Sequence, residues 1–230
     1  MTGVRARVRA ELTAEIKAIA RRQIASEGAS SLSLRGIARE LGMASSAIYR
    51  YFPGRDELLT ALIVDAYDTI GMIAEQADAP VDRDDLMGRW RAVGHAAFRW
   101  ADENTAEYAL IFGTPVPGYI APPDTIGPAT RFTGVLVAIL VDASSAGVEM
   151  PPSSLLPLSK RTTRDLRALV RQLDRPIDER LLFVGLHAWS SLIGTISLIL
   201  FGHLQNVIDD HGAFFADIVD HLGSELFGAA

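Results

Sequence analysis

Two short apolar segments joined by a glycine constrain the fold of this chain more than any other feature. The first places four apolar residues on one helix face at spacings i, i+3, i+4 and i+7: Leu34, Ile37, Ala38 and Leu41. Gly42 follows at once, where a helix end favours a left-handed backbone. Ser45 or Ser46 then suits the N-cap of a second helix, in which Ile48 and Phe52 lie four residues apart. The pattern predicts a helix-turn-helix unit, whose second helix can enter the major groove of DNA.

The charge of the chain is divided unequally along its length. Residues 1–55 hold ten Lys or Arg and four Asp or Glu, whereas residues 56–230 hold twelve basic and twenty-four acidic residues. The net charge of −6 therefore combines a basic head with an acidic body. Because DNA affinity depends on local neutralisation of phosphates, the head suits a DNA-binding domain. We predict a DNA-binding domain over 1–55 and a second domain over 56–230. Within the head, a basic arm over 1–9 either tracks the minor groove or is a solvated tail.

Helical periodicity runs through nearly the whole chain, and no alternating strand pattern is present. Cysteine is absent, which excludes disulfides and thiolate chemistry. Proline-rich loops are expected over 113–128 and 149–159. The sequence therefore predicts an all-α fold, with helices over these ranges: 7–27, 34–41, 45–52, 56–78, 83–103, 108–112, 129–144, 161–173, 177–205 and 212–226.

One segment is long and apolar enough to cross a bilayer. Residues 181–202 carry no formal charge over 22 positions. Several hydroxyl groups and His187 interrupt this segment, and its ends lack aromatic and basic residues. A central helix of a dimer has the same composition, and the N-terminus has no signal-peptide pattern. We therefore expect no membrane attachment and a cytoplasmic protein.

The N-terminal motif resembles the DNA-binding signature of the TetR family of transcriptional regulators. The matching residues are Ile37-Ala38, Gly42-Met43, Ile48-Tyr49, Tyr51-Phe52, Arg55 and Leu58-Leu59. Residues 108–123 and 186–204 are similar to the C-terminal domain of one branch of the family, in which Trp, His and Gly recur in the penultimate helix. His187 and Trp189 are present here, whereas Ala188 replaces the glycine. The resemblance implies a three-helix DNA-binding domain followed by a helical domain for ligand binding and dimerisation.

The resemblance also implies a mechanism and a set of DNA contacts. Members of the family are homodimers in which a small ligand changes the distance between the two recognition helices and releases the operator. A two-fold dimer requires a palindromic operator of double-stranded DNA. The positions that would contact base edges are Ser45, Ser46 and Ala47, whereas Arg35 would contact either a base edge or a phosphate. Arg35 and Arg50 would supply much of the specificity. The positions that would contact phosphates are Tyr49, Tyr51 and Arg55.

Ligand and dimer contacts are assigned from aromatic and helical patterns. The candidate ligand-binding residues are Trp90, His95, Trp100, Tyr108, Phe112, Tyr119, His187 and Trp189, although aromatic residues at helical spacing also build cores. Two apolar stripes on the penultimate helix favour one inward face and one partner-facing face. The candidate dimer-interface residues are Ala188, Ser191, Thr195, Gly202, Phe215, Ile218 and Leu222.

Two other classes of function remain as alternatives. A small-molecule carrier that does not use its DNA-binding segment would share the same apolar helices. An enzyme is disfavoured because no phosphate loop, nucleophile elbow or paired carboxylates occur. The histidines and aspartates over 203–221 match no metal-ligand spacing, so we expect neither a metal nor another cofactor. The favoured function is a repressor released by a small apolar or aromatic molecule.

Overall fold

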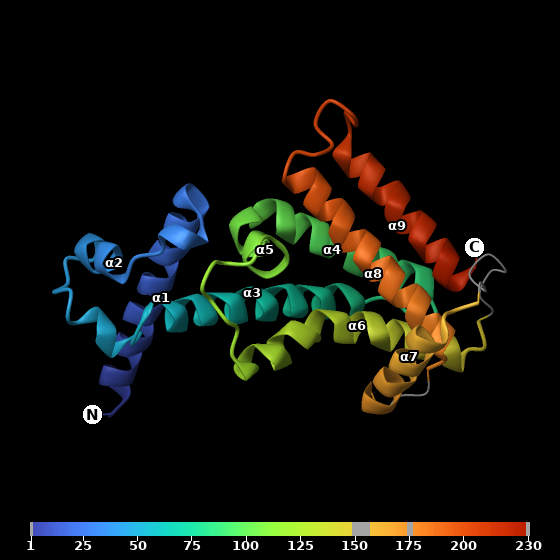
Figure 1. Ribbon diagram of the computed structural model, residues 1–230, viewed down its shortest axis with the longest axis horizontal. Helices are drawn as coiled ribbons and strands as arrows, with labels where there is room; N and C mark the ends of the chain where they lie inside the picture. The colour runs from blue at the N-terminus through green and yellow to red at the C-terminus, as the bar shows by residue number, and fades with distance from the viewer. Residues whose placement is uncertain (1, 149–156, 174–176, 229–230) are drawn as a thin grey trace. The chain divides into compact units, whose positions relative to one another are not determined.

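A computed structural model describes residues 2–148, 157–173 and 177–228. Over these residues the chain forms nine α-helices and three short 3-10 helices with no strand, so the predicted all-α fold is confirmed (Figure 1). The N-terminal elements are α1 (Thr2–Glu27), η1 (Ala29–Ser31), α2 (Leu34–Glu40), η2 (Ile48–Arg50) and α3 (Arg55–Asp78). The remaining elements are α4 (Leu86–Glu103), α5 (Thr105–Phe112), η3 (Pro123–Thr125), α6 (Ile126–Ser145), α7 (Lys160–Leu173), α8 (Glu179–Leu200) and α9 (His211–Phe227). Most of the predicted 149–159 loop lies outside the described residues.

The chain divides into two compact units. The first comprises residues 1–68 and 104–129, and the second comprises residues 69–103 and 130–230. Helix α3 begins in the first unit and ends in the second. The predicted boundary at residue 55 stays a prediction.

The core of the first unit is built from the apolar faces that the sequence pattern predicts. Ile16 of α1, Ile37 of α2 and Ile48 of η2 are completely buried in one cluster. The hydroxyl of Ser33 caps α2 by accepting from the Gly36 amide at 3.2 Å. Gly42 has a φ of 65°, which is the left-handed conformation expected after this helix. These contacts fix the beginning and the end of the first helix of the motif.

Two parts of the first unit differ from the prediction. The proposed basic arm over 1–9 is not a separate segment, because residues 2–9 continue α1. Alanine and arginine are good helix formers, and no proline interrupts this stretch. The second helix of the motif is shorter than predicted, since residues 44–51 form a hydrogen-bonded turn and then η2. Neither Ser45 nor Ser46 caps it, because the N-cap position of η2 is Ala47 and carries no side-chain bond.

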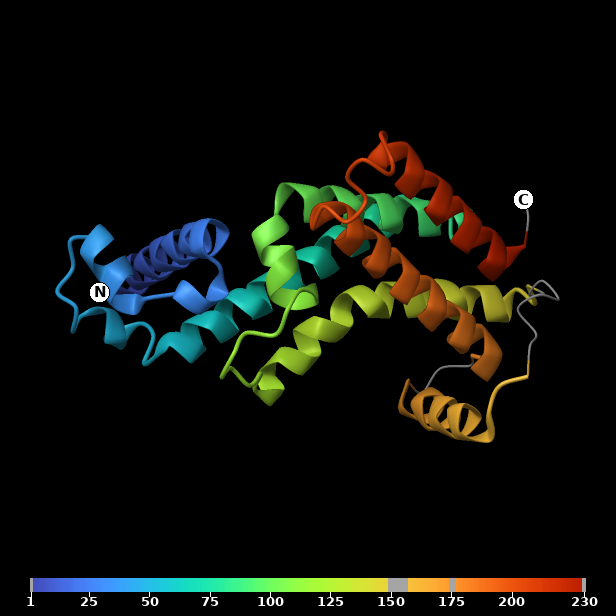
Figure 2. The ribbon, with the colours of Figure 1, turned by 45° about the horizontal axis from the view of Figure 1, so that its top comes forward.

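In the second unit, α8 and α9 lie side by side and both pack against α4 (Figures 1 and 2). Gly94 permits this approach, because a Cβ there would lie 3.2 Å from Val219 and 3.6 Å from Leu192. The indole N–H of Trp90 donates to the Val219 carbonyl at 2.8 Å, and Phe98 stacks on Phe215 with ring centroids 4.4 Å apart. These contacts form the core of the second unit.

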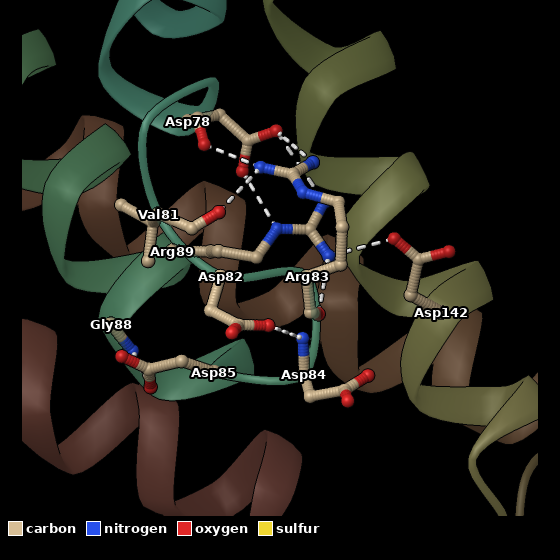
Figure 3. Close-up of polar contacts among 9 residues, drawn as sticks. All are labelled: Asp78, Val81, Asp82, Arg83, Asp84, Asp85, Gly88, Arg89 and Asp142. Carbon is tan, nitrogen blue, oxygen red and sulfur yellow. Dashed lines mark hydrogen bonds and ion pairs between the residues drawn. The ribbon is translucent and has the colours of Figure 1, made fainter.

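A buried arginine joins three helices of the second unit (Figure 3). Arg89 of α4 is completely buried and donates to Asp78 at the end of α3 at 2.8 Å and to Asp142 of α6 at 2.7 Å. Arg83 also donates to Asp78, at 2.6 Å. Burial opposes ionisation of Asp78, but hydrogen bonds from Arg89 and Arg83 outweigh it, so the pKa of this carboxyl lies below its ordinary value.

Two helical segments are long and apolar enough to cross a membrane, by length and composition alone. They are residues 123–145 and 179–200, and 33% of the apolar window in each is buried within the chain. The second segment overlaps the stretch discussed from the sequence. Apolar helices of soluble proteins meet the same criterion, so this finding is weak evidence for a membrane span.

Candidate nucleic-acid interface and ligand cavity

The exposed side chains of the helix-turn-helix segment form the candidate nucleic-acid interface. Five of the eight predicted DNA-contacting residues are exposed: Arg35, Ser45, Ser46, Tyr49 and Arg50. Their backbone is fixed by short-range bonds, including Ala47 N–H to the Ala44 carbonyl at 2.8 Å. The guanidinium of Arg35 projects from the first turn of α2 and has no ion-pair partner within residues 2–148, 157–173 and 177–228. This surface offers cations, hydroxyls and a phenol to an incoming molecule.

Arg9, in the N-terminal part of α1, contacts the segment that contains Arg50 and Tyr51. Its guanidinium donates to the Arg50 carbonyl at 2.9 Å and lies 5.4 Å from the centre of the Tyr51 ring. Sequence reasoning placed Arg9 in an arm and missed this role. Arg5, Arg7 and Arg9 indicate a basic surface in the sequence. Only the helical geometry of α1 shows that Arg9 lies next to Arg50 and Tyr51.

The remaining three predicted DNA-contacting residues are half-buried: Ala47, Tyr51 and Arg55. Arg55 donates to the Ala29 carbonyl at 2.9 Å and pairs with Asp56 at 3.3 Å. It therefore connects η1 to the beginning of α3. Any contact that Arg55 makes with a phosphate must use the part of its guanidinium that these two partners leave open.

A cavity of about 540 Å³ lies among α6, α7 and α8 of the second unit. Its volume falls within the range of small-molecule sites. None of the lining residues is charged, and most are aliphatic: Thr130, Thr133, Gly134, Leu136, Val137, Ala138, Leu140, Val141, Leu169, Leu173, Leu182, Gly185, Leu186 and Trp189. The cavity therefore suits an apolar molecule.

Trp189 is the one predicted ligand-binding residue among those that line this cavity. Trp90, Trp100 and Tyr108 are buried in the cores of their units. The Tyr119 hydroxyl lies 2.9 Å from that of Thr60, and His95 contacts the edge of Phe215. Phe112 packs on Tyr108, and His187 is exposed. Sequence reasoning missed the aliphatic lining, because the apolar pattern of α6 does not distinguish a cavity wall from a filled core.

The predicted dimer-interface residues divide between buried and accessible positions. Ala188, Phe215 and Leu222 are at most 4% exposed within their own chain, so they belong to its core, and their place in a dimer interface stays a prediction. Ala188 lies one turn before Leu192, whose side chain lies 3.6 Å from the Cβ position of Gly94 on α4. Gly202 lies beyond the end of α8, with a φ of 77°.

Other residues of these helices remain accessible. Ser191, Thr195 and Ile218 are half-buried. The large exposed apolar side chains of α8 and its end are Phe183, Leu186, Leu198 and Phe201. The outward face of α8 therefore carries large apolar side chains.

Comparisons with known proteins match two parts of the chain to family models. Residues 16–62 match the family model of bacterial regulatory proteins of the tetR family, and residues 90–222 match a tetracyclin repressor-like C-terminal domain. The chain is 38% identical over 221 residues to the HTH-type transcriptional regulator Rv1816 of Mycobacterium tuberculosis, covering 93% of this chain and 91% of the relative.

Solved structures show the same architecture. The crystal structure of the regulatory protein SCO4313 is 38% identical, with a TM-score of 0.76 over 94% of this chain and 97% of that one. RolR in complex with resorcinol is 17% identical and shares the fold, with a TM-score of 0.52 over 98% of this chain and 97% of that one. The resemblance identified from the N-terminal motif is confirmed over nearly the whole chain.

Proposed function

The chain belongs to the TetR family of transcriptional regulators, and from this premise we propose that it is a repressor that binds a palindromic operator as a homodimer. Binding of a small apolar or aromatic molecule in the second unit would release the operator. The relatives are transcriptional regulators rather than enzymes, and proteins of this kind act on DNA in the cytoplasm.

The observation that carries the proposal is the presence of two different surfaces in one chain. The first unit exposes Arg35, Tyr49 and Arg50 together on the helix-turn-helix segment. The second unit encloses an uncharged cavity of about 540 Å³. A surface for polyanions combined with a cavity for apolar molecules is what a ligand-responsive regulator requires, whereas a carrier needs only the cavity. RolR, which shares this fold, binds resorcinol, so the fold can enclose an aromatic ligand.

A homodimer is supported by the outward face of α8. Phe183, Leu198 and Phe201 are 39%, 44% and 42% exposed, and the half-buried Ile218 lies on the adjacent α9. Covering these side chains with a second copy would remove apolar area from water. We propose that α8 and α9 of two copies form a four-helix interface. A two-fold axis would then place the recognition segments about 34–36 Å apart, or a multiple of this distance, and would impose palindromy on the operator.

A reporter experiment tests repression directly. An operator selected from random DNA by the purified protein is placed between a promoter and a reporter gene, in cells with and without the chain. The proposal predicts lower reporter expression when the chain is present and two copies of the chain per operator. Higher expression would identify an activator. Failure to enrich any sequence would favour the carrier alternative.

A further inference from the structure

We propose that Arg9 of α1 is a positioning residue that holds the recognition segment, residues 45–51, in the form that binds DNA. Its side chain acts through Arg50 and Tyr51 rather than by contacting DNA itself. The inference rests on the proposed function, because it assigns a role in operator binding to a residue outside the helix-turn-helix motif.

The recognition segment is too short to hold its shape alone. It consists of a hydrogen-bonded turn followed by the three residues of η2, and a helical segment of this length is not stable in isolation. The last carbonyls of a helix also lack amide partners within their own segment. Basic side chains can donate to such carbonyls. The segment therefore depends on partners outside itself for a fixed conformation.

Arg9 supplies such a partner from a distant part of the sequence. Its Nη2 atom donates to the Arg50 carbonyl at 2.9 Å, across 41 positions of the chain. Its guanidinium carbon lies 5.4 Å from the centre of the Tyr51 ring, which is within the range of a cation–π interaction. One planar group therefore contacts both the backbone and an aromatic side chain at the end of the recognition segment.

The part of α1 that carries Arg9 does not belong to the core of the first unit. Residues 3–11 are all exposed, and the first buried residue of this helix is Ile16. Removing the Arg9 side chain should therefore release the recognition segment and leave the core intact. Arg7 lies on the same exposed stretch but pairs with Glu11 of α1 itself at 3.7 Å. Arg7→Ala is thus a matched control that removes the same charge from the same helix.

Amide hydrogen exchange of the free, full-length protein tests the inference without DNA. The amides of Tyr51 and Phe52 both donate within the segment 48–52, so their exchange rates report whether it keeps its conformation. We expect Arg9→Ala to raise these rates about three- to ten-fold, the effect of losing one net hydrogen bond, and Arg7→Ala to leave them unchanged. Equal rates in the two variants overturn the inference. An equal rise in the amides of α3 also overturns it, because Arg9 would then be needed for the fold as a whole.

Fluorescence anisotropy distinguishes positioning from a direct contact with DNA. Arg9→Ala should weaken binding of the selected operator about three- to ten-fold, with a much smaller effect on scrambled DNA. The slope of log affinity against log salt should stay that of the natural protein, because no phosphate contact is removed. An equal loss for both DNAs, together with a salt slope reduced by about 1, would identify Arg9 as a phosphate contact and contradict the inference.

A double-mutant cycle identifies the side chain through which Arg9 acts. Tyr51→Phe keeps the aromatic ring but removes the hydroxyl that is expected to contact a phosphate. If Arg9 positions this hydroxyl, the double variant should lose less operator affinity than the product of the two single losses. Losses that multiply fully would contradict the assignment to Tyr51. Failure to enrich any operator would contradict the proposed function alone, because the exchange rates still decide whether Arg9 holds the recognition segment.

Discussion

At the scale of single residues, Arg89 organises the second unit. Its guanidinium is buried, and its partners come from the end of α3 and from α6 (Figure 3). A buried cation is costly unless carboxylates surround it. The sequence does not predict this cluster, because an arginine on a helix resembles any solvated residue until the helices are packed.

Asp78→Asn tests the stabilising role of this cluster. Removing one partner of a buried ion pair costs about 3–5 kcal/mol, and because Asp142 remains we expect a loss of about 3 kcal/mol in the free energy of unfolding at pH 7. Asp220→Asn is the control, because Asp220 pairs with Arg91 at 2.6 Å on an exposed surface, and its loss should stay below about 1 kcal/mol. Equal losses measured by urea denaturation would show that Asp78 has no special role.

The stability difference between the natural chain and Asp78→Asn should also depend on pH. The pKa of Asp78 is lowered in the folded state, so its contribution is present above the ordinary pKa of about 3.9 and is lost as pH falls through the lower folded value. The difference in stability between the natural chain and Asp78→Asn should therefore shrink on acidification below pH of about 4. A difference that grows on acidification would be inconsistent with a lowered pKa.

We expect recognition of the DNA sequence to depend on Arg35. Arg35→Ala should weaken operator binding by about 1–3 kcal/mol and relax the preference at one base pair if the side chain contacts a base edge. Arg22→Ala is a control on the same unit, because Arg22 already pairs with Glu40 at 2.7 Å. An equal loss of affinity for operator and scrambled DNA in fluorescence anisotropy would instead identify Arg35 as a phosphate contact.

At the scale of elements, the first and last residues of a helix can be predicted closely from the sequence. Which side of the helix is buried cannot. The predicted helices over 56–78, 161–173 and 212–226 differ from α3, α7 and α9 by at most one residue at either end. Capping residues, prolines and glycines mark these ends locally. Which stripe of α8 faces inward depends on packing against α4 and α9, and the small-residue stripe that we assigned to a partner contains the buried Ala188.

Leu198→Glu tests the outward face of α8. Leu198 is 44% exposed in the single chain, so the substitution should leave the fold intact but place a charge in the proposed four-helix interface. Light scattering should then give the mass of one 24.9 kDa chain, whereas the natural protein gives twice that mass. Met72→Glu is the matched control, with a side chain 40% exposed on α3. A dimer that persists in Leu198→Glu would place the interface elsewhere.

At the scale of the whole molecule, charge is distributed unequally along the chain. Residues 1–55 carry a net charge of +6 and residues 56–230 a net charge of −12, so polyanions are attracted to the N-terminal segment rather than to the rest of the chain. The sequence revealed this division, the helix-turn-helix motif and the family. It did not reveal the cavity, because the apolar pattern of a helix does not show whether the space beside α6, α7 and α8 is filled by side chains.

The central claim is that the helix-turn-helix surface binds a specific DNA sequence. Fluorescence anisotropy with the selected operator and scrambled DNA, measured from about 50 to 200 mM salt, tests it most directly. We predict operator binding with a dissociation constant of about 10⁻⁸–10⁻¹¹ M near physiological salt, at least about 10³-fold tighter than to scrambled DNA, and a steep loss of affinity as salt increases. Equal affinity for both DNAs, or binding insensitive to salt, would contradict the claim.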